Sequence, residues 1–107
     1  MDKARSYLLE GVKLGESTND SIRYIQALIA LGDCDFERSL YSEAIKSYRK
    51  ALDIAKGYGM LEFEQSLYLK LSKCYYKIGD LQKQDVCIEN YYRVGLKLDQ
   101  AKGGLKI

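Results

Sequence analysis

The clearest pattern in the chain is a small, an aromatic and a second small residue that share one helix face. Ala44, Tyr48 and Ala51 are four and three positions apart, and a helix turns once in about 3.6 residues, so their side chains point the same way. The same spacing recurs 40 positions later and 40 positions earlier, in Gln84, Ile88 and Tyr91 and in Ala4, Leu8 and Gly11. Self-similarity at a period of roughly 20–50 residues indicates an array of stacked units.

Apolar positions follow helical spacing in five segments, and no stretch alternates with the period of two that is typical of strands. The expected helices cover residues 2–14, 21–38, 41–55, 61–78 and 81–98. Residues that favour turns and helix caps separate them, above all in residues 15–20, 57–59 and 79–80. We therefore expect one all-α domain over residues 1–107, with a half-repeat helix in 1–16, one repeat in 20–58, a second in 60–98 and a fraying tail in 99–107.

Charge and hydropathy argue against two classes of partner. The 17 basic and 15 acidic side chains are interspersed and leave a net charge of +2. Such a small excess does not predict binding to nucleic acid or to a membrane surface by bulk electrostatics. The best apolar run, residues 25–31, is far too short to span a bilayer. We expect neither a nucleic-acid nor a membrane partner.

Cysteine and histidine usage argues against a metal site, a cofactor and catalysis. Cys34, Cys74 and Cys87 form no Cys-x-x-Cys pair, and the chain has no histidine, so a structural zinc site is not expected. The glycine-rich motifs that bind phosphates or dinucleotides are absent, and no cysteine or serine has a base at informative spacing. We expect no cofactor, no metal and no catalytic residue. The odd number of cysteines favours a reducing, cytoplasmic location.

The repeating unit resembles the tetratricopeptide repeat, whose first helix carries a bulky residue, then leucine-glycine, then an aromatic. The first unit has Leu28, Leu31, Gly32 and Phe36 in these places, and the second has Tyr68, Leu71, Ser72 and Tyr76. Ala44, Tyr48 and Ala51 match the second-helix pattern in full. The 40-residue period resembles the longer repeats of spindle-orientation scaffolds, kinesin light chains and bacterial peptide-pheromone regulators. The resemblance implies a right-handed superhelical α-solenoid of antiparallel helix pairs with about five helices.

Two residues depart from the family pattern. Gln84 stands where a small residue is expected, and Asp35 where an aromatic is expected. Each indicates either looser packing or a polar partner. The family's clamp for a terminal carboxylate needs a lysine and an asparagine, but Ile29 and Asp33 occupy those positions, so that activity does not carry over.

The resemblance implies a non-catalytic protein–protein interaction module that binds a peptide or partner protein on the concave face made by the first helices. The residues that match this face are Gln26, Ile29, Asp33, Phe36 and Glu37 in the first repeat and Ser66, Leu69, Lys70, Lys73, Tyr76 and Lys77 in the second. Their charges would form one acidic and one basic bank of a groove. The competing interpretation is that these charges only bridge each other on a solvated surface.

Two further functions stay open. Two and a half units fall below the roughly three that a stable array needs, so the end helices would self-associate. That interpretation uses Tyr91, Tyr92, Val94 and Leu98 at one end, or Leu8, Val12 and Leu14 at the other. The other is a fragment of a peptide-responsive regulator, which would need an additional effector domain.

Overall fold

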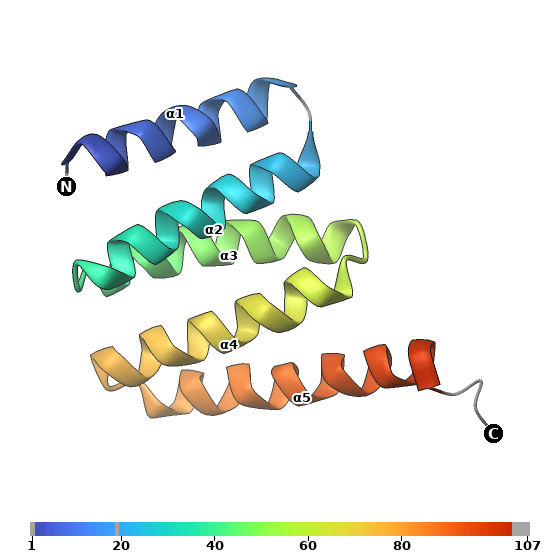
Figure 1. Cartoon of the computed structure of the whole chain (residues 1–107). Helices are drawn as coiled ribbons and strands as arrows, with labels where there is room; N and C mark the ends of the chain where they lie inside the picture. Colours follow the sequence, from blue (N-terminus) through green and yellow to red (C-terminus); the bar gives the residue numbers. More distant parts are fainter. Residues whose placement is uncertain (1, 19, 104–107) are drawn as a thin grey trace.

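The computed structural model describes residues 2–18 and 20–103, and within them every regular element is an α-helix (Figure 1). The helices are α1 (Asp2–Thr18), α2 (Ser21–Glu37), α3 (Tyr41–Gly57), α4 (Leu61–Ile78) and α5 (Leu81–Gly103). The predicted all-α class and its five helices are confirmed for this part of the chain, which contains no strand.

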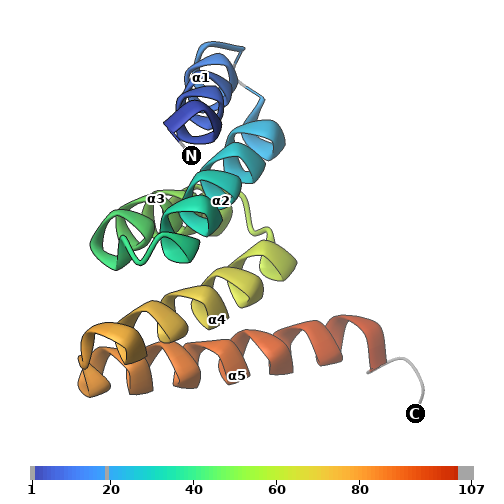
Figure 2. The same ribbon diagram turned by 60° about the vertical axis from the view of Figure 1, so that its left-hand side comes forward.

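The helices form an open stack in the order of the sequence. Each helix packs chiefly against the helices that precede and follow it. Figures 1 and 2 show α1 and α5 at opposite ends of the stack. The central helix, α3, packs against both α2 and α4, and the whole stack measures 51 × 36 × 18 Å.

The turns that end α2, α3 and α4 close in the same way. In each, a backbone N–H donates to the carbonyl oxygen five residues earlier, from Leu40 to Asp35, from Met60 to Ala55 and from Asp80 to Tyr75, at 2.8 to 2.9 Å. The residue before each donor has a positive φ, at Ser39, Gly59 and Gly79. Glycine adopts this left-handed conformation without steric penalty, so Gly59 and Gly79 mark the turns after α3 and α4 in the sequence. The donors lie 20 residues apart, so two helices make up each 40-residue period.

Three helices are longer than predicted: α3 runs two residues past the expected 55, to Gly57, and α1 and α5 extend further. α1 continues to Thr18, through part of the expected turn at residues 15–20. Asp20 of that turn caps α2, and its side chain accepts from the Arg23 N–H at 3.2 Å. α5 continues to Gly103, although residues 99–107 were expected to fray. Most of residues 96–102 are good helix formers, and this stretch contains no glycine or proline that would end the helix. Residues 104–107 of the expected tail lie outside the described part of the chain.

Tyr48 of α3 lies at the centre of the core. Its side chain is only 2% exposed, and Ala44 and Ala51 are fully buried beside it. The ring lies directly against Gly32 of α2, where an added Cβ would come within 2.5 Å of a ring carbon. Glycine is therefore the residue that lets α2 approach α3 this closely. The predicted small–aromatic–small face of residues 44–51 is confirmed as a core face.

We predict that Gly32→Ala destabilises the protein by about 2 kcal/mol, because a methyl group would overlap the Tyr48 ring in a packed core. Gly11→Ala is the matched control: its Cβ would lie 3.8 Å from that of Ala27, an ordinary contact. The control should gain up to about 1 kcal/mol from helix propensity. Urea unfolding followed by circular dichroism measures both, and equal changes in the two variants would contradict the role given to Gly32.

Candidate partner-binding groove

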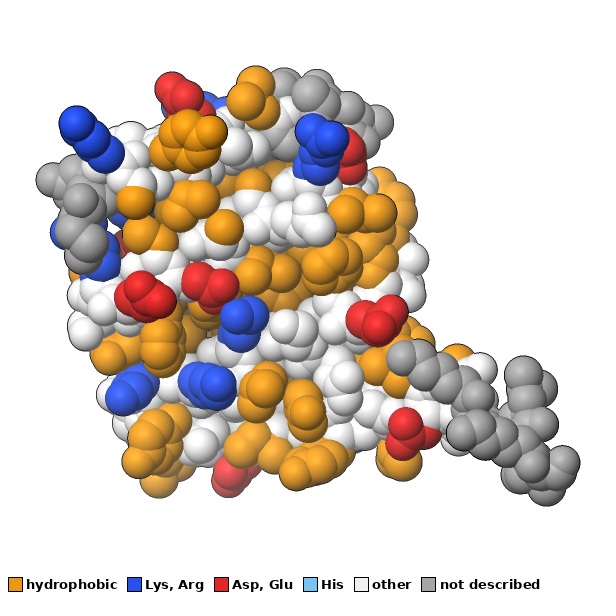
Figure 3. Space-filling view, in the orientation of Figure 1, with side chains coloured by type: hydrophobic (Ala, Val, Ile, Leu, Met, Phe, Trp, Pro, Cys, Tyr) orange, Lys and Arg blue, Asp and Glu red, His pale blue; other side chains and the backbone are white. Residues whose placement is uncertain are grey.

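A hollow of about 730 Å³, open on one side, lies between α2, α4 and the last turns of α5. Figure 3 shows apolar side chains gathered between α2 and α4, toward the end where α3 joins α4. The lining residues are Ile22, Ile29, Gly59, Met60, Leu61, Glu62, Phe63, Ser66 and Leu98. We call this hollow the apolar pocket. It offers space and contact area for a large aliphatic or aromatic side chain.

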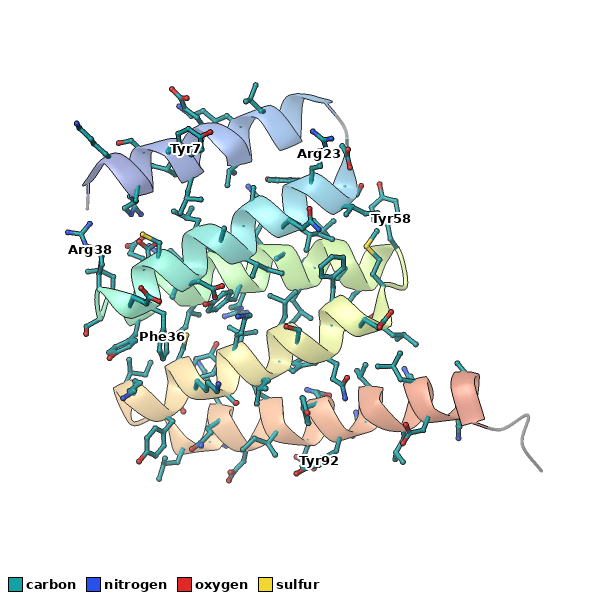
Figure 4. The ribbon with its side chains drawn as sticks, in the orientation of Figure 1. Tyr7, Arg23, Phe36, Arg38, Tyr58 and Tyr92 are labelled. Carbon is teal, nitrogen blue, oxygen red and sulfur yellow. The ribbon has the colours of Figure 1, made fainter. Side chains whose placement is uncertain are left out.

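A second hollow, of about 350 Å³, lies at the other end of the same two helices. It is lined by Phe36, Ser72, Lys73, Tyr76, Lys77 and Gln84, and we call it the lysine pocket. Figure 4 shows Phe36 extending from α2 toward α4, and its ring meets that of Tyr41 edge to face with centroids 5.2 Å apart. Gln84, which departs from the small residue of the family pattern, lines this pocket. The pocket combines aromatic surface with two exposed cations.

A polar bridge lies between helices α2, α3 and α4. The Tyr48 hydroxyl donates to the Asp33 carboxylate, and Lys70 Nζ lies 3.0 Å from the same oxygen. The Lys70 ammonium also lies 5.9 Å from the centroid of the Tyr48 ring. Burial raises the pKa of the Tyr48 phenol, and the hydrogen bond to Asp33 raises it further, so the phenol stays protonated and keeps donating at neutral pH.

This bridge changes the expected charge pattern of the groove. Asp33 and Lys70 neutralise each other across adjacent helices, as the competing interpretation of the sequence held for such charges. Glu37, Lys73 and Lys77 are exposed and make no ion pair with any described residue. The groove is therefore basic at its lysine pocket and neutral at the bridge.

The other predicted contact residues fall into three groups. Ile29 and Ser66 line the apolar pocket, and Phe36, Lys73, Tyr76 and Lys77 line the lysine pocket. Three residues lie on the surface but line neither pocket: Gln26, Glu37 and Leu69.

Sequence reasoning missed several residues of the apolar pocket. Ile22 is seven positions before Ile29, so helical spacing places both on one face and gave a usable signal. Met60 and Leu61 come from the turn that precedes α4 and from its first residue, where periodicity carries no signal. Leu98, expected at a self-association surface, lines the apolar pocket and also another hollow beside Tyr92, because α5 extends alongside α4.

The end-helix residues are not equally exposed. Val94 is only 5% exposed and packs into the core, so it does not face outward as a self-association surface requires. Tyr92 is 66% exposed, and Tyr91 is half-buried and meets the Tyr92 ring edge to face. At the other end Leu8 and Val12 are half-buried, whereas Leu14 is 63% exposed.

Asp35, the second departure from the family pattern, has a polar partner. Its carboxylate is fully buried and accepts from Arg5 Nε of α1 at 2.9 Å. The hydrogen bond and the charge of Asp35 raise the pKa of the Arg5 guanidinium. The second carboxylate oxygen is buried without a hydrogen-bond partner among the described residues. Removing Arg5 would therefore leave a buried, uncompensated charge.

The three cysteines are free thiols in different environments. Cys74 and Cys87 are buried, whereas Cys34 is half-buried. Burial, together with the charge of Asp33, raises the pKa of the Cys74 thiol to about 11, and burial also raises that of Cys87. Because the thiolate is the reactive form, Cys74 and Cys87 are poor nucleophiles at neutral pH.

The described residues show neither a membrane span nor a metal cluster. Within 2–18 and 20–103, no helix combines the length and apolar character needed to cross a bilayer. In the same residues, no three cysteine, aspartate or glutamate side chains are grouped so that they could hold a metal ion.

No protein-family model matches the chain, and no curated protein matches its sequence. The resemblance to tetratricopeptide repeats rests on the residue pattern.

We predict that Arg5→Met lowers the free energy of unfolding by about 2 kcal/mol, less than the 3–5 kcal/mol of fully enclosed pairs because Arg5 is 30% exposed. The double variant Arg5→Met, Asp35→Leu should recover most of that loss, since it removes the buried charge together with its partner. Arg23→Met is the control, because its pair with Asp20 is exposed and should contribute less than about 1 kcal/mol. Denaturant unfolding tests this, and a double variant less stable than Arg5→Met would contradict it.

We predict one fast-reacting thiol per native chain at pH 8, that of Cys34. At that pH a thiol with a pKa near 11 is only about 0.1% thiolate, and Cys74 is also buried. Titration with a chromogenic disulfide should give one rapid equivalent, none in Cys34→Ser, and three in urea. Fast labelling of Cys74 in the native protein would refute the assignment of the reactive thiol to Cys34.

The raised thiol pKa values also stabilise the fold below the unfolded thiol pKa of 9.0, and this stabilisation should decline as pH rises from about 9 to 11.

Proposed function

We propose that this chain is a non-catalytic peptide-binding module with the architecture of a long tetratricopeptide-like solenoid. The observation that carries the proposal is the pair of pockets on one face of α2 and α4, one apolar and one lined by lysines. The three free cysteines are consistent with a reducing, cytoplasmic setting, which is part of the proposal.

The bound segment would follow the groove from one pocket to the other. Ile29 in the apolar pocket and Phe36 in the lysine pocket are seven residues apart on α2, which corresponds to about 10 Å along a helix axis. An extended peptide rises roughly 3.3 Å per residue, so about four to six residues cover both pockets. The apolar pocket would take a large aliphatic or aromatic side chain.

Charge sets the orientation of this segment. Lys73 and Lys77 carry the unpaired charge of the lysine pocket and would attract a glutamate or aspartate of the partner. Asp33 would not repel that group, since Lys70 already neutralises it. The preferred partner is therefore a short segment with an apolar anchor followed or preceded, about 10 Å away, by an acidic residue.

The stacked architecture supports the family proposal by its repeat spacing. The hydrogen bond that closes each helix-ending turn recurs every 20 residues. Gly32, the glycine of the family's leucine-glycine pair, packs directly against Tyr48, the aromatic residue of the alanine–aromatic–alanine face. Such arrays present one long face made by alternate helices, which here are α2 and α4.

We predict that Lys73→Glu with Lys77→Glu weakens binding of an acidic peptide with a leucine anchor by about 10-fold or more. The probe is a panel of six-residue peptides that vary the separation of leucine and two glutamates. Arg93→Glu with Lys97→Glu is the control, because it changes the net charge equally on exposed positions of α5 and should alter affinity less than 2-fold. Both variants should keep the helical circular dichroism of the parent.

Amide chemical shifts locate the bound peptide. They should change at Ile29, Ser66 and Lys73, whose side chains line the pockets. Shifts gathered at Glu43 and Lys50 of α3, or equal losses in the two charge variants, would rule out the groove.

A further inference from the structure

The two ends of the stack leave apolar side chains exposed at positions that are covered in its centre. Residues 40 positions apart occupy equivalent places, so α3 provides the reference for both α1 and α5. Leu52 of α3 is 9% exposed, but its equivalent in α5, Tyr92, is 66% exposed. Ser47 of α3 is also 9% exposed, but its equivalent in α1, Tyr7, is 78% exposed. Each end helix therefore lacks a neighbour on one side.

One side of the exposed surface of α5 carries apolar and acidic residues and no basic one. It consists of Leu81, Asp85, Ile88, Glu89, Tyr92, Leu96 and Asp99, which share one side of the helix at three- and four-residue steps. We call it the acidic face. A hollow of about 520 Å³ lies along its second half, next to Tyr92, Gly95 and Leu96. Lys83, Arg93 and Lys97 are also exposed and lie on other sides of α5.

The exposed face of α1 has the complementary chemistry. Tyr7 and Leu14 are its large apolar side chains, 78% and 63% exposed. Among the α1 side chains that the structure describes, Lys3, Glu10 and Lys13 are exposed around them. Figure 4 shows Tyr7 and Tyr92 at opposite ends of the stack, with Tyr92 pointing away from α4.

Charge decides which surfaces can meet. Two acidic faces placed together would set Asp85, Glu89 and Asp99 of one copy against the same acids of the other, with no cation between them. Two α1 faces would bring together Lys3 and Lys13 of both copies, with Glu10 as the exposed acid that each contributes to pair with them. The acidic face against α1 pairs aspartate and glutamate with lysine and places the exposed Tyr7 and Tyr92 in one apolar contact.

We propose that copies of this chain associate head to tail, with the acidic face of α5 in one copy packed against α1 of the next. This contact gives each end helix a second neighbour, as α3 has within the chain. Because the two surfaces differ, the interface is heterologous and each added copy presents a fresh α5, so the assembly grows beyond a dimer. One helix-on-helix contact is small, so association should be weak, with a dissociation constant of roughly 10–100 µM.

Two end-blocking variants test the proposal. Tyr7→Glu blocks α1 and leaves the acidic face intact, while Tyr92→Glu blocks the acidic face and leaves α1 intact. Both positions are highly exposed, so both variants should keep the fold, as judged by circular dichroism and thermal unfolding. Sedimentation velocity from about 5 to 500 µM should show a mass that rises with concentration for the parent chain, and a monomer for each variant alone.

The mixture of the two variants gives the decisive result. One variant supplies an intact α5 and the other an intact α1, so an equimolar mixture should form a one-to-one heterodimer that does not grow further. Raising the salt concentration to about 0.5 M should weaken it, because exposed charges are screened. Tyr76→Glu, which changes an equally exposed tyrosine in the lysine pocket, should associate as the parent does.

Three outcomes would overturn the proposal. They are a parent chain that stays monomeric up to 500 µM, a Tyr7→Glu variant that associates as strongly as the parent, and a mixture that remains monomeric. None of these outcomes affects peptide binding, because neither Tyr7 nor Tyr92 lines the apolar or lysine pocket.

Discussion

The contact of the Tyr48 ring with Gly32 is the interaction on which the rest of the structure depends. Since no side chain separates them, α2 and α3 approach closely and the phenol reaches across to Asp33. Asp33 in turn accepts from Lys70 of α4. One side chain of α3 thus positions α2 through packing and α4 through a hydrogen-bonded charge. The two pockets lie on the helices that this arrangement holds in place.

The attachment of α1 follows a different physical rule. A buried ion pair adds little net stability, because removing both charges from water offsets most of their attraction. Its effect is on register: sliding α1 by one turn along α2 would separate Arg5 from Asp35 and leave the carboxylate buried without its cation. The aspartate in the place of an aromatic therefore selects one position for α1, while the apolar contacts of Leu8 and Val12 alone would tolerate several.

The sequence predicted the fold class and most helix boundaries, because local chemistry decides them. Gly59 and Gly79 end helices by adopting positive φ, and periodicity alone identifies the Tyr48 face. The groove was predicted less completely. Whether Asp33 faces solvent or Lys70 depends on the distance between α2 and α4, and that distance is set by tertiary packing. For the same reason Val94 was placed at an outer surface, although the side of α5 that meets α4 buries it.

An open stack separates its functions by geometry. The groove uses α2 and α4, the ends of the stack use α1 and α5, and α3 contributes mainly to the core. Substitutions of Tyr7 or Tyr92 should therefore leave the groove unchanged, because neither side chain lines the apolar or the lysine pocket. If copies join at their ends, each brings one groove, and a partner with two matching segments would then bind two grooves in one assembly. The second binding step becomes intramolecular, so a weak groove combined with a weak end contact yields strong overall binding only when both are intact.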